Sequence, residues 1–349
     1  MMVIGVCGFG YTGSSALYSL LAEFSNVVTY GSIKNDFEFN ISYTPDGLED
    51  LEYNLCLNPS KGVRGDIAVY RFLNYAKAYK KSFNRLTNGR FDLYTNVFIN
   101  GLVSTKWKAY RTFEFERNPR RIFEWKVRGF FMTKFKKLGL NMYAYPKTTR
   151  YLSVFPNEFE SKCREYISNL IFGEKKDVNT VVVLNQPFSA NNPLNSMKFF
   201  PNPKCIFVDR DPRDLYAMLK HVYGIIGAFI PSNDVSSFIK YYREIRDNRL
   251  YKNSESVITI HFEDLVYRYQ ETIDMLKTFL GKDIGEHINK KSFFDPDISI
   301  KNTNVYKLYP EDKEDVELIE KELKDYLYDF KEIDSVENNK KELSKFNFM

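Results

Sequence analysis

The chain has 349 residues, of which 44% are hydrophobic and 27% are charged. This balance predicts a folded globular protein with a sizeable core and excludes a miniprotein or a disordered chain. Four widely spaced cysteines form no Cys-x-x-Cys pair, and with only three histidines they predict neither a disulfide framework nor a metal site. The sequence has no run of about 18 apolar residues that could span a membrane, and we expect a cytoplasmic protein.

The first predicted elements are a strand, a glycine-rich turn and a helix. Residues 3–7 form a short apolar run, and glycines recur through residues 8–13. The apolar residues that follow have helical spacing, which predicts a helix with one buried face. They are Ala16, Leu17, Leu20, Leu21 and Phe24. Residues 27–30 are expected to form the next strand.

A mostly helical and basic segment is predicted over residues 62–170. Within it, residues 104–150 hold 13 Lys or Arg against 3 Glu, interleaved with Phe and Trp. Such a cluster attracts an anionic partner, which could be phosphate groups, an acidic glycan or the inner face of a membrane. An ordinary solvated amphipathic helix is the alternative. No nucleic-acid-binding motif accompanies the cluster, so no nucleic acid partner is predicted.

Strands return in the second half of the chain. Residues 180–184 and 204–208 are continuous apolar runs, typical of strands buried on both faces of a parallel sheet, and 257–261 is a third such run. Helices are expected over 213–223 and 269–280. The alternation predicts an α/β fold with a central parallel sheet, a P-loop-like strand, turn and helix, and flanking helices.

An acidic helix is predicted after Pro310, with its apolar residues on one narrow face. We therefore expect one α/β domain over residues 1–334, with residues 62–170 as a helical basic insertion or cap. Residues 335–349 are expected to form a loose tail.

The first turn carries the clearest chemical signal. It reads Gly-Phe-Gly-Tyr-Thr-Gly-Ser-Ser over residues 8–15, between a strand and a helix, where backbone N–H groups can bind phosphate or sulfate oxygens. The spacing is that of a P-loop with Ser14 in place of the lysine, which disfavours ATP or GTP hydrolysis. A dinucleotide-binding turn is disfavoured because no acidic residue ends the next strand. A tight turn that binds no ligand is the alternative.

Two further signals follow later strands. In Asp-Arg-Asp-Pro-Arg-Asp-Leu, residues 209–215, Arg210 stands at the carboxyl edge of the predicted sheet, where a guanidinium can bind a phosphate through two hydrogen bonds. The third signal is His-Phe-Glu-Asp-Leu at residues 261–265, followed by a helix that ends in Thr-Phe-Leu-Gly at 278–281.

In this order, the three segments resemble the sulfotransferase family that uses 3′-phosphoadenosine 5′-phosphosulfate (PAPS), in its bacterial carbohydrate-modifying form. The resemblance leaves the basic segment unmatched. It implies a P-loop-like sulfotransferase fold that moves a sulfuryl group from PAPS to a hydroxyl of a glycan or lipid-linked carbohydrate, without a metal. A non-catalytic protein that binds a nucleotide or another anion on the same fold is the alternative.

The resemblance also implies site residues. In the family the first loop binds the 5′-phosphosulfate, and the arginine after the later strand, here Arg210, binds the 3′-phosphate. The matching loop residues are Gly10, Tyr11, Thr12, Gly13, Ser14 and Ser15. Some glycan-modifying members place the catalytic base just beyond the first helix, which implies Asp36 or Glu38 here. A surface turn with two acidic residues is the alternative for both.

Two positions depart from the family pattern. Tyr11 stands where the family has a Lys or Arg that neutralises the departing phosphate, and Met218 stands where a serine contacts the 3′-phosphate. Lys34, Lys301 or a cation of the basic segment could supply the missing charge, and we count Lys301 among the donor-binding candidates. A degenerate donor site or a different anionic donor is the alternative.

Overall fold

The computed structural model describes residues 1–30, 37–60, 62–109, 119–137, 148–173, 181–224 and 229–330. The chain divides into two compact units, the first made of Met1–Ser42 with Ile171–Met349 and the second of Tyr43–Leu170. The second unit begins before residue 62, where we placed the start of the insertion, because helix α2 (Leu48–Glu52) packs against helix α3 (Val63–Leu86). The predicted tail lies outside the described residues.

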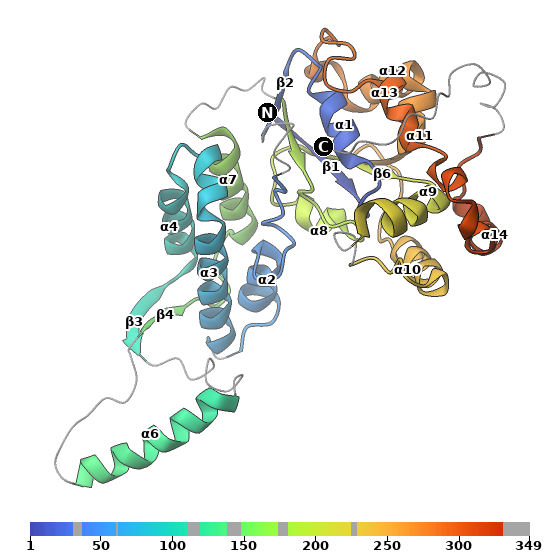
Figure 1. Ribbon diagram of the computed structural model, residues 1–349. Helices are drawn as coiled ribbons and strands as arrows, with labels where there is room; N and C mark the ends of the chain where they lie inside the picture. The colour runs from blue at the N-terminus through green and yellow to red at the C-terminus, as the bar shows by residue number, and fades with distance from the viewer. Residues whose placement is uncertain are drawn as a thin grey trace. The chain divides into compact units, whose positions relative to one another are not determined.

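The first unit is built on a five-stranded sheet (Figure 1). Its strands are β1 (Met2–Gly8), β2 (Val27–Thr29), β5 (Val181–Asn185), β6 (Pro203–Asp209) and β7 (Val257–His261). They follow the order β2-β5-β1-β6-β7, and every neighbouring pair is parallel. All residues of β1 and β5 are buried, as expected for strands covered on both faces. The predicted α/β class and the central parallel sheet are confirmed.

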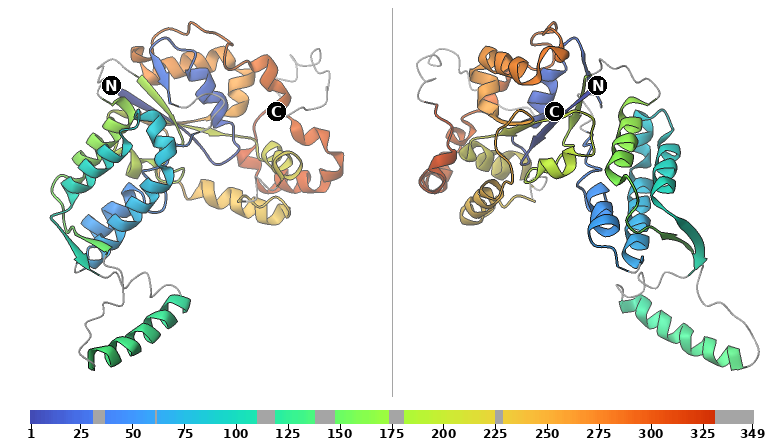
Figure 2. Two further views of the ribbon diagram at one scale, coloured as in Figure 1. Left: turned by 60° about the vertical axis from the view of Figure 1, so that its left-hand side comes forward. Right: turned by 180° about the vertical axis from the view of Figure 1, so that it is seen from behind.

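Helices cover both faces of this sheet (Figures 1 and 2). On one face, helices α1 (Ser14–Leu21), α11 (Phe262–Tyr267) and α12 (Tyr269–Leu280) share an apolar core with the strands. The other face carries α8 (Pro193–Met197), α9 (Pro212–Ala217) and α10 (Val235–Asp247). Helix α14 (Lys313–Glu322), the predicted acidic helix, packs on α9 and α10 through buried Ile319 and through Leu323, the residue that follows the helix. The short helix α13 (Pro296–Ser299) packs on α11.

The chain leaves β1 and β6 toward opposite faces, since β1 leads to α1 and β6 leads to α9. In parallel sheets, loops that separate in this way leave a crevice at the carboxyl ends of the two strands, and ligands bind there. The fold therefore places the glycine turn after β1 and Arg210 after β6 on the two sides of one crevice.

A buried ion pair fixes the end of β6. The guanidinium of Arg246 in α10 donates to the carboxylate of Asp209 at 2.5 to 3.2 Å, and it lies 4.6 Å from the ring centre of Phe9. Burial acts to raise the pKa of Asp209, but the contact with Arg246 outweighs it and the pKa is lowered. The carboxylate thus stays charged and holds α10 against the sheet.

The second unit is mainly helical, as predicted. Besides α2 and α3 it contains the π-helix η1 (Tyr53–Leu57), α4 (Phe91–Leu102), α6 (Pro119–Lys137) and all but the last two residues of α7 (Phe159–Phe172). It also has an antiparallel strand pair, β3 (Thr105–Ala109) and β4 (Thr148–Leu152). Stacked rings form its core, with centroid distances of 4.7 Å for Phe83 and Phe91 and 4.5 Å for Phe98 and Tyr166. In the described part of the chain, no helix is long and apolar enough to cross a membrane.

Candidate active site

A cavity of about 520 Å³ lies at the carboxyl ends of β1, β5 and β6 in the first unit. Its walls come from the glycine turn and the start of α1, the end of β5, Arg210 after β6, and the π-helix η2 (Met218–Tyr223). The rest of the lining includes Glu38, Phe229, Phe262 and Asn302. The fold thus brings together all three segments that the sequence singled out, although about 200 residues separate Tyr11 and Arg210 along the chain.

The glycine turn has the backbone conformation that an anion-binding loop needs. Gly10, Tyr11 and Gly13 have φ angles of 89°, 56° and 98°, in the left-handed region that favours glycine. A Cβ atom on Gly13 would lie 2.6 Å from the ring of Phe262, so the position has no room for a side chain. Ser14 and Ser15 open helix α1 at the cavity wall, and the first N–H groups of a helix have no partner within the helix. These N–H groups can bind an anion in the cavity.

Thr12 lies behind the turn rather than in the cavity wall. Its side chain is 1% exposed, and its hydroxyl donates to the carbonyl of Val208 at 2.6 Å and accepts from the N–H of Phe9 at 3.2 Å. Thr12 therefore ties the turn to β6 and shapes the loop without facing a ligand.

Gln186 is a second support of the turn, which the sequence did not reveal. The N–H of Gly8 donates to its side-chain oxygen at 3.2 Å, and its side-chain nitrogen donates to the hydroxyl of Ser14 at 3.2 Å. Its φ of 50° is unusual for a residue other than glycine and is the kind of strained backbone that occurs at functional sites. The only sequence signal was its place directly after β5.

Arg210 is the central cation of the cavity. Its side chain lies over the ring of Phe262, 5.0 Å from the centroid, and donates to the carbonyls of Tyr11 (3.5 Å) and Asn302. Arg210 is only 3% exposed, and its buried Nε has no hydrogen-bond partner among the described residues. A buried donor without a partner is costly, and an anionic ligand would supply the acceptor. Among the described residues that line the cavity, Arg210 is the only Lys or Arg.

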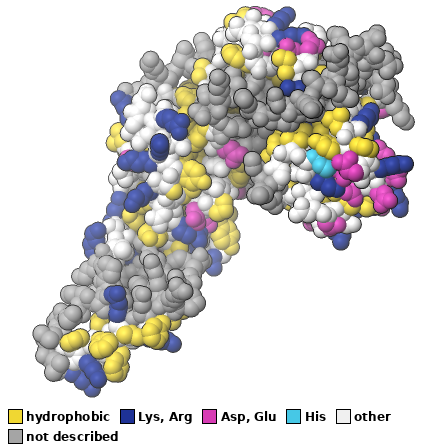
Figure 3. Space-filling model, viewed as in Figure 1, with side chains coloured by type: hydrophobic (Ala, Val, Ile, Leu, Met, Phe, Trp, Pro, Cys, Tyr) yellow, Lys and Arg dark blue, Asp and Glu magenta, His cyan; other side chains and the backbone are white. Residues whose placement is uncertain are grey.

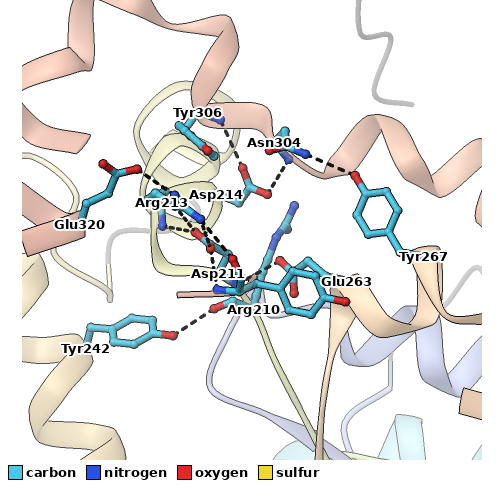
Figure 4. Close-up of polar contacts among 11 residues, drawn as sticks. Arg210, Asp211, Arg213, Asp214, Tyr242, Glu263, Tyr267, Asn304, Tyr306 and Glu320 are labelled. Carbon is cyan, nitrogen blue, oxygen red and sulfur yellow. Dashed lines mark hydrogen bonds and ion pairs between the residues drawn. The ribbon is translucent and has the colours of Figure 1, made fainter. Parts of the chain in front are cut away.

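A buried polar network surrounds the backbone next to Arg210 (Figure 4). Arg213 donates to the carboxylate of Asp211 at 2.7 and 2.9 Å and to Glu320 at 2.8 Å. The N–H of Asp211 in turn donates to the carboxylate of Glu263 at 3.0 Å. Glu263 belongs to the third sequence segment, so this segment acts as scaffold that fixes the backbone directly after Arg210. The sequence did not single out Arg213 for this role.

Asp214 anchors the loop that supplies Asn302. Its carboxylate accepts hydrogen bonds from the N–H groups of Asn304 at 2.7 Å and Tyr306 at 3.2 Å (Figure 4). Burial raises the pKa of Asp214 to about 6, and burial together with the neighbouring carboxylates raises the pKa of Glu263 well above its ordinary value. The network therefore holds a high density of carboxyl groups whose charge depends on the nearby arginines.

The remaining candidates, two acidic residues and two lysines, differ in their position relative to the cavity. Glu38 is an exposed residue in the cavity wall, and its neighbour Phe39 donates its N–H to the carbonyl of Asn185 at 2.8 Å, next to the end of β5. Asp36 and Lys34 lie outside the described residues. Lys301 is exposed in a short 3-10 helix and does not line the cavity, whereas the next residue, Asn302, does.

Both departures from the family pattern face the cavity. The ring of Tyr11 lies 4.4 Å from that of Tyr223 and 5.5 Å from that of Phe229, so an aromatic wall stands where the family has a cation. Burial, with contributions from Tyr223 and Glu38, raises the pKa of Tyr11, which keeps its hydroxyl neutral. Met218 is 2% exposed and begins η2, where the helix predicted over 213–223 changes from α to π geometry. Such changes are frequent at functional sites.

No protein-family model matches the chain, and no curated protein matches it. Among solved structures, the chain is similar to one described as "Sulfotransferase Domain from the Curacin Biosynthetic Pathway". The TM-score is 0.39 and the sequence identity 13%, with 93% of this chain and 97% of that chain covered. A similarity of this size carries no argument about activity, and the function is inferred below from the cavity.

Proposed function

We propose that the protein is a PAPS-dependent sulfotransferase that acts on a hydroxyl of a glycan or lipid-linked carbohydrate. The observation that carries the proposal is that the glycine turn and Arg210 line one cavity. PAPS bears a phosphosulfate on its 5′ carbon and a phosphate on its 3′ carbon, so it needs two separate anion sites within reach of one ribose. The first N–H groups of α1 would bind the phosphosulfate, and Arg210 would bind the 3′-phosphate.

The proposed reaction transfers the sulfuryl group in line. The acceptor hydroxyl oxygen forms a bond to sulfur, the bond from sulfur to the 5′-phosphate oxygen breaks, and the phosphate leaves with the electron pair. Glu38, which faces the cavity, takes the hydroxyl proton. The N–H groups of the turn and α1 stabilise the charge that develops on the leaving phosphate. With Ser14 in place of the P-loop lysine, the turn is less suited to the transfer of a γ-phosphoryl group.

A carbohydrate acceptor is supported by the aromatic side of the cavity. Tyr11, Tyr223 and Phe229 present adjacent rings, and sugar rings pack their C–H faces on such surfaces. Arg210 is the only Lys or Arg among the described residues that line the cavity, and the donor would occupy it. The acceptor should therefore bind to the uncharged aromatic wall through apolar contacts and hydrogen bonds rather than through ion pairs.

A second candidate function is nucleotide binding without transfer. It is favoured by Tyr11 and Met218, because both put an uncharged side chain where the family contacts the donor. In this case the cavity would still bind 3′-phosphoadenosine 5′-phosphate (PAP), the product nucleotide, but would not form PAP from PAPS by sulfuryl transfer.

The test measures binding and turnover separately on the full chain. Calorimetry with PAP measures binding, and sulfur-labelled PAPS with a panel of free glycans and lipid-linked sugars measures transfer. The proposal expects PAP binding and labelled acceptor, and it expects Glu38→Gln to lose most turnover while PAP affinity stays the same. PAP binding without turnover on any acceptor would favour the second candidate. Failure to bind PAP would exclude both.

A further inference from the structure

Helix α6 presents large apolar side chains to solvent. Phe123, Phe130 and Phe131 are 69%, 59% and 51% exposed, and Val127 between them is 38% exposed. Their spacing of four, seven and eight residues from Phe123 places them on one face of the helix. Exposed aromatic side chains gathered in this way mark an interaction surface rather than an ordinary solvated helix.

The same helix is strongly basic. Its nineteen residues contain seven Lys or Arg and a single acidic residue. Five of these cations have described, exposed side chains, and the space-filling view shows basic and hydrophobic side chains together on this helix (Figure 3). They are Lys126, Arg128, Lys134, Lys136 and Lys137. The ammonium group of Lys134 lies 4.7 Å from the ring centre of Phe130, so charge and aromatic surface belong to one patch.

The strand that precedes α6 has a similar composition. In β3, Trp107 is 41% exposed and lies between the exposed residues Lys106 and Lys108. Tryptophan beside lysine is typical of the boundary between membrane and water, where the ring enters the headgroup region and the charge meets lipid phosphates.

We propose that α6 is an interfacial helix that binds the surface of an anionic lipid bilayer. Phe123, Val127, Phe130 and Phe131 enter the boundary between headgroups and acyl chains, while the lysines extend their stems along this surface and place their charges at lipid phosphates. The helix is about 28 Å long, which suits it to lie in the plane of the interface. The positive charge around the aromatic face favours an anionic bilayer as the partner, because such a bilayer offers both an apolar interior and negatively charged headgroups.

This inference rests on α6 and β3, not on the nucleotide cavity, and it stands or falls separately from the proposed enzyme activity. Binding to the bilayer would bring the protein close to a lipid-linked carbohydrate and would raise the local concentration of such an acceptor.

The test is co-sedimentation of the full chain with vesicles of phosphatidylcholine alone or of equal parts phosphatidylcholine and phosphatidylglycerol. One variant carries Phe123→Gln, Phe130→Gln and Phe131→Gln, and a second carries Lys126→Gln, Lys134→Gln, Lys136→Gln and Lys137→Gln. Glutamine preserves helix propensity better than serine or glycine would. The matched control changes three exposed apolar residues of the first unit, Leu194→Gln, Leu250→Gln and Ile288→Gln, which are 52%, 69% and 61% exposed.

The proposal expects binding to the anionic vesicles, little binding to phosphatidylcholine alone, and loss of binding in about 0.5 M salt. The affinity of each α6 variant for anionic vesicles should fall by about tenfold or more, while the control variant should bind like the native chain. Circular dichroism should show that all variants remain folded. Equal binding to both vesicle types, or native binding by the phenylalanine variant, would overturn the proposal. Two further results would reject the lipid surface as occupant. The first is that the native chain is a dimer and the phenylalanine variant becomes a monomer without any change in vesicle binding. The second is that the lysine variant no longer binds an acidic glycan but binds vesicles like the native chain.

Discussion

Replacing Arg210 with alanine should weaken the binding of nucleotides that carry a 3′-phosphate and leave the binding of those that lack it nearly unchanged. The native side chain is buried in the cavity, with its Nε free of any hydrogen bond among the described residues. A contact between a guanidinium and a phosphate through charged hydrogen bonds is worth about 2 to 3 kcal/mol, or about 30- to 150-fold in the dissociation constant. The affinity for PAP should fall by this factor, while that for AMP, which lacks the 3′-phosphate, should change by less than about threefold.

Arg210 also has structural contacts, so the assay must report folding. The side chain donates to the carbonyls of Tyr11 and Asn302, and its charge opposes the burial that raises the pKa of Asp214 and of Glu263. Removing it should therefore lower the melting temperature as well. We would measure PAP and AMP affinity by calorimetry at fixed pH and ionic strength, well below the melting temperature of each variant.

Two controls sharpen the interpretation. Arg210→Lys keeps the charge but loses the planar guanidinium, so PAP binding should be intermediate. Arg243 is a half-buried arginine of the same unit that pairs with Glu322 and does not line the cavity, and Arg243→Ala should leave both affinities unchanged. Equal losses for PAP and AMP in a folded Arg210→Ala protein would show that Arg210 does not hold the 3′-phosphate. Unchanged PAP affinity would refute the assignment altogether.

Three further predictions concern stability. Gly13→Ala should cost about 2 to 4 kcal/mol in urea denaturation, because its φ is 98° and the added Cβ would lie 2.6 Å from the ring of Phe262; a loss near zero would contradict the geometry of the turn. Arg246→Met leaves the Asp209 carboxylate buried without its partner and should cost about 3 to 5 kcal/mol, part of which Asp209→Asn in the same protein should restore. The folded-state pKa of Asp214 is raised to about 6, so its contribution to stability is fully present below the unfolded pKa near 4 and is lost as pH rises through about 6. Asp214→Asn should flatten this part of the stability profile, and an unchanged slope would show that another group titrates there.

Local sequence features were enough to define most of the elements of the first unit. Apolar runs predicted all five strands of the sheet within one or two residues, and residues 257–261 and 269–280 match β7 and α12 in full. The glycine turn was also recognisable, because positive φ angles and a following helix depend on residues next to one another. These features are short-range, since steric limits and apolar periodicity act within a few residues.

The helix expected over residues 213–223 shows where local patterns stopped being sufficient. Its apolar and polar residues suit a continuous helix, but the structure changes to π geometry at Met218, which is buried beside the cavity. A π-turn differs from an α-turn by one added residue and has no strong composition of its own, so it depends on packing.

The tertiary structure alone decided which residues share the cavity and what each of them does. Thr12 and Ser14 are two residues apart, yet Thr12 bonds to Val208, 196 residues away, and faces the core, while Ser14 bonds to Gln186, 172 residues away, and faces the cavity. The raised pKa of Asp214 likewise depends first on its burial and then on the balance between Arg210, which lowers it, and Asp211, which raises it. Hydrogen bonding, burial and electrostatics depend on distance in space, and a single sequence does not contain those distances until the strand order β2-β5-β1-β6-β7 is known.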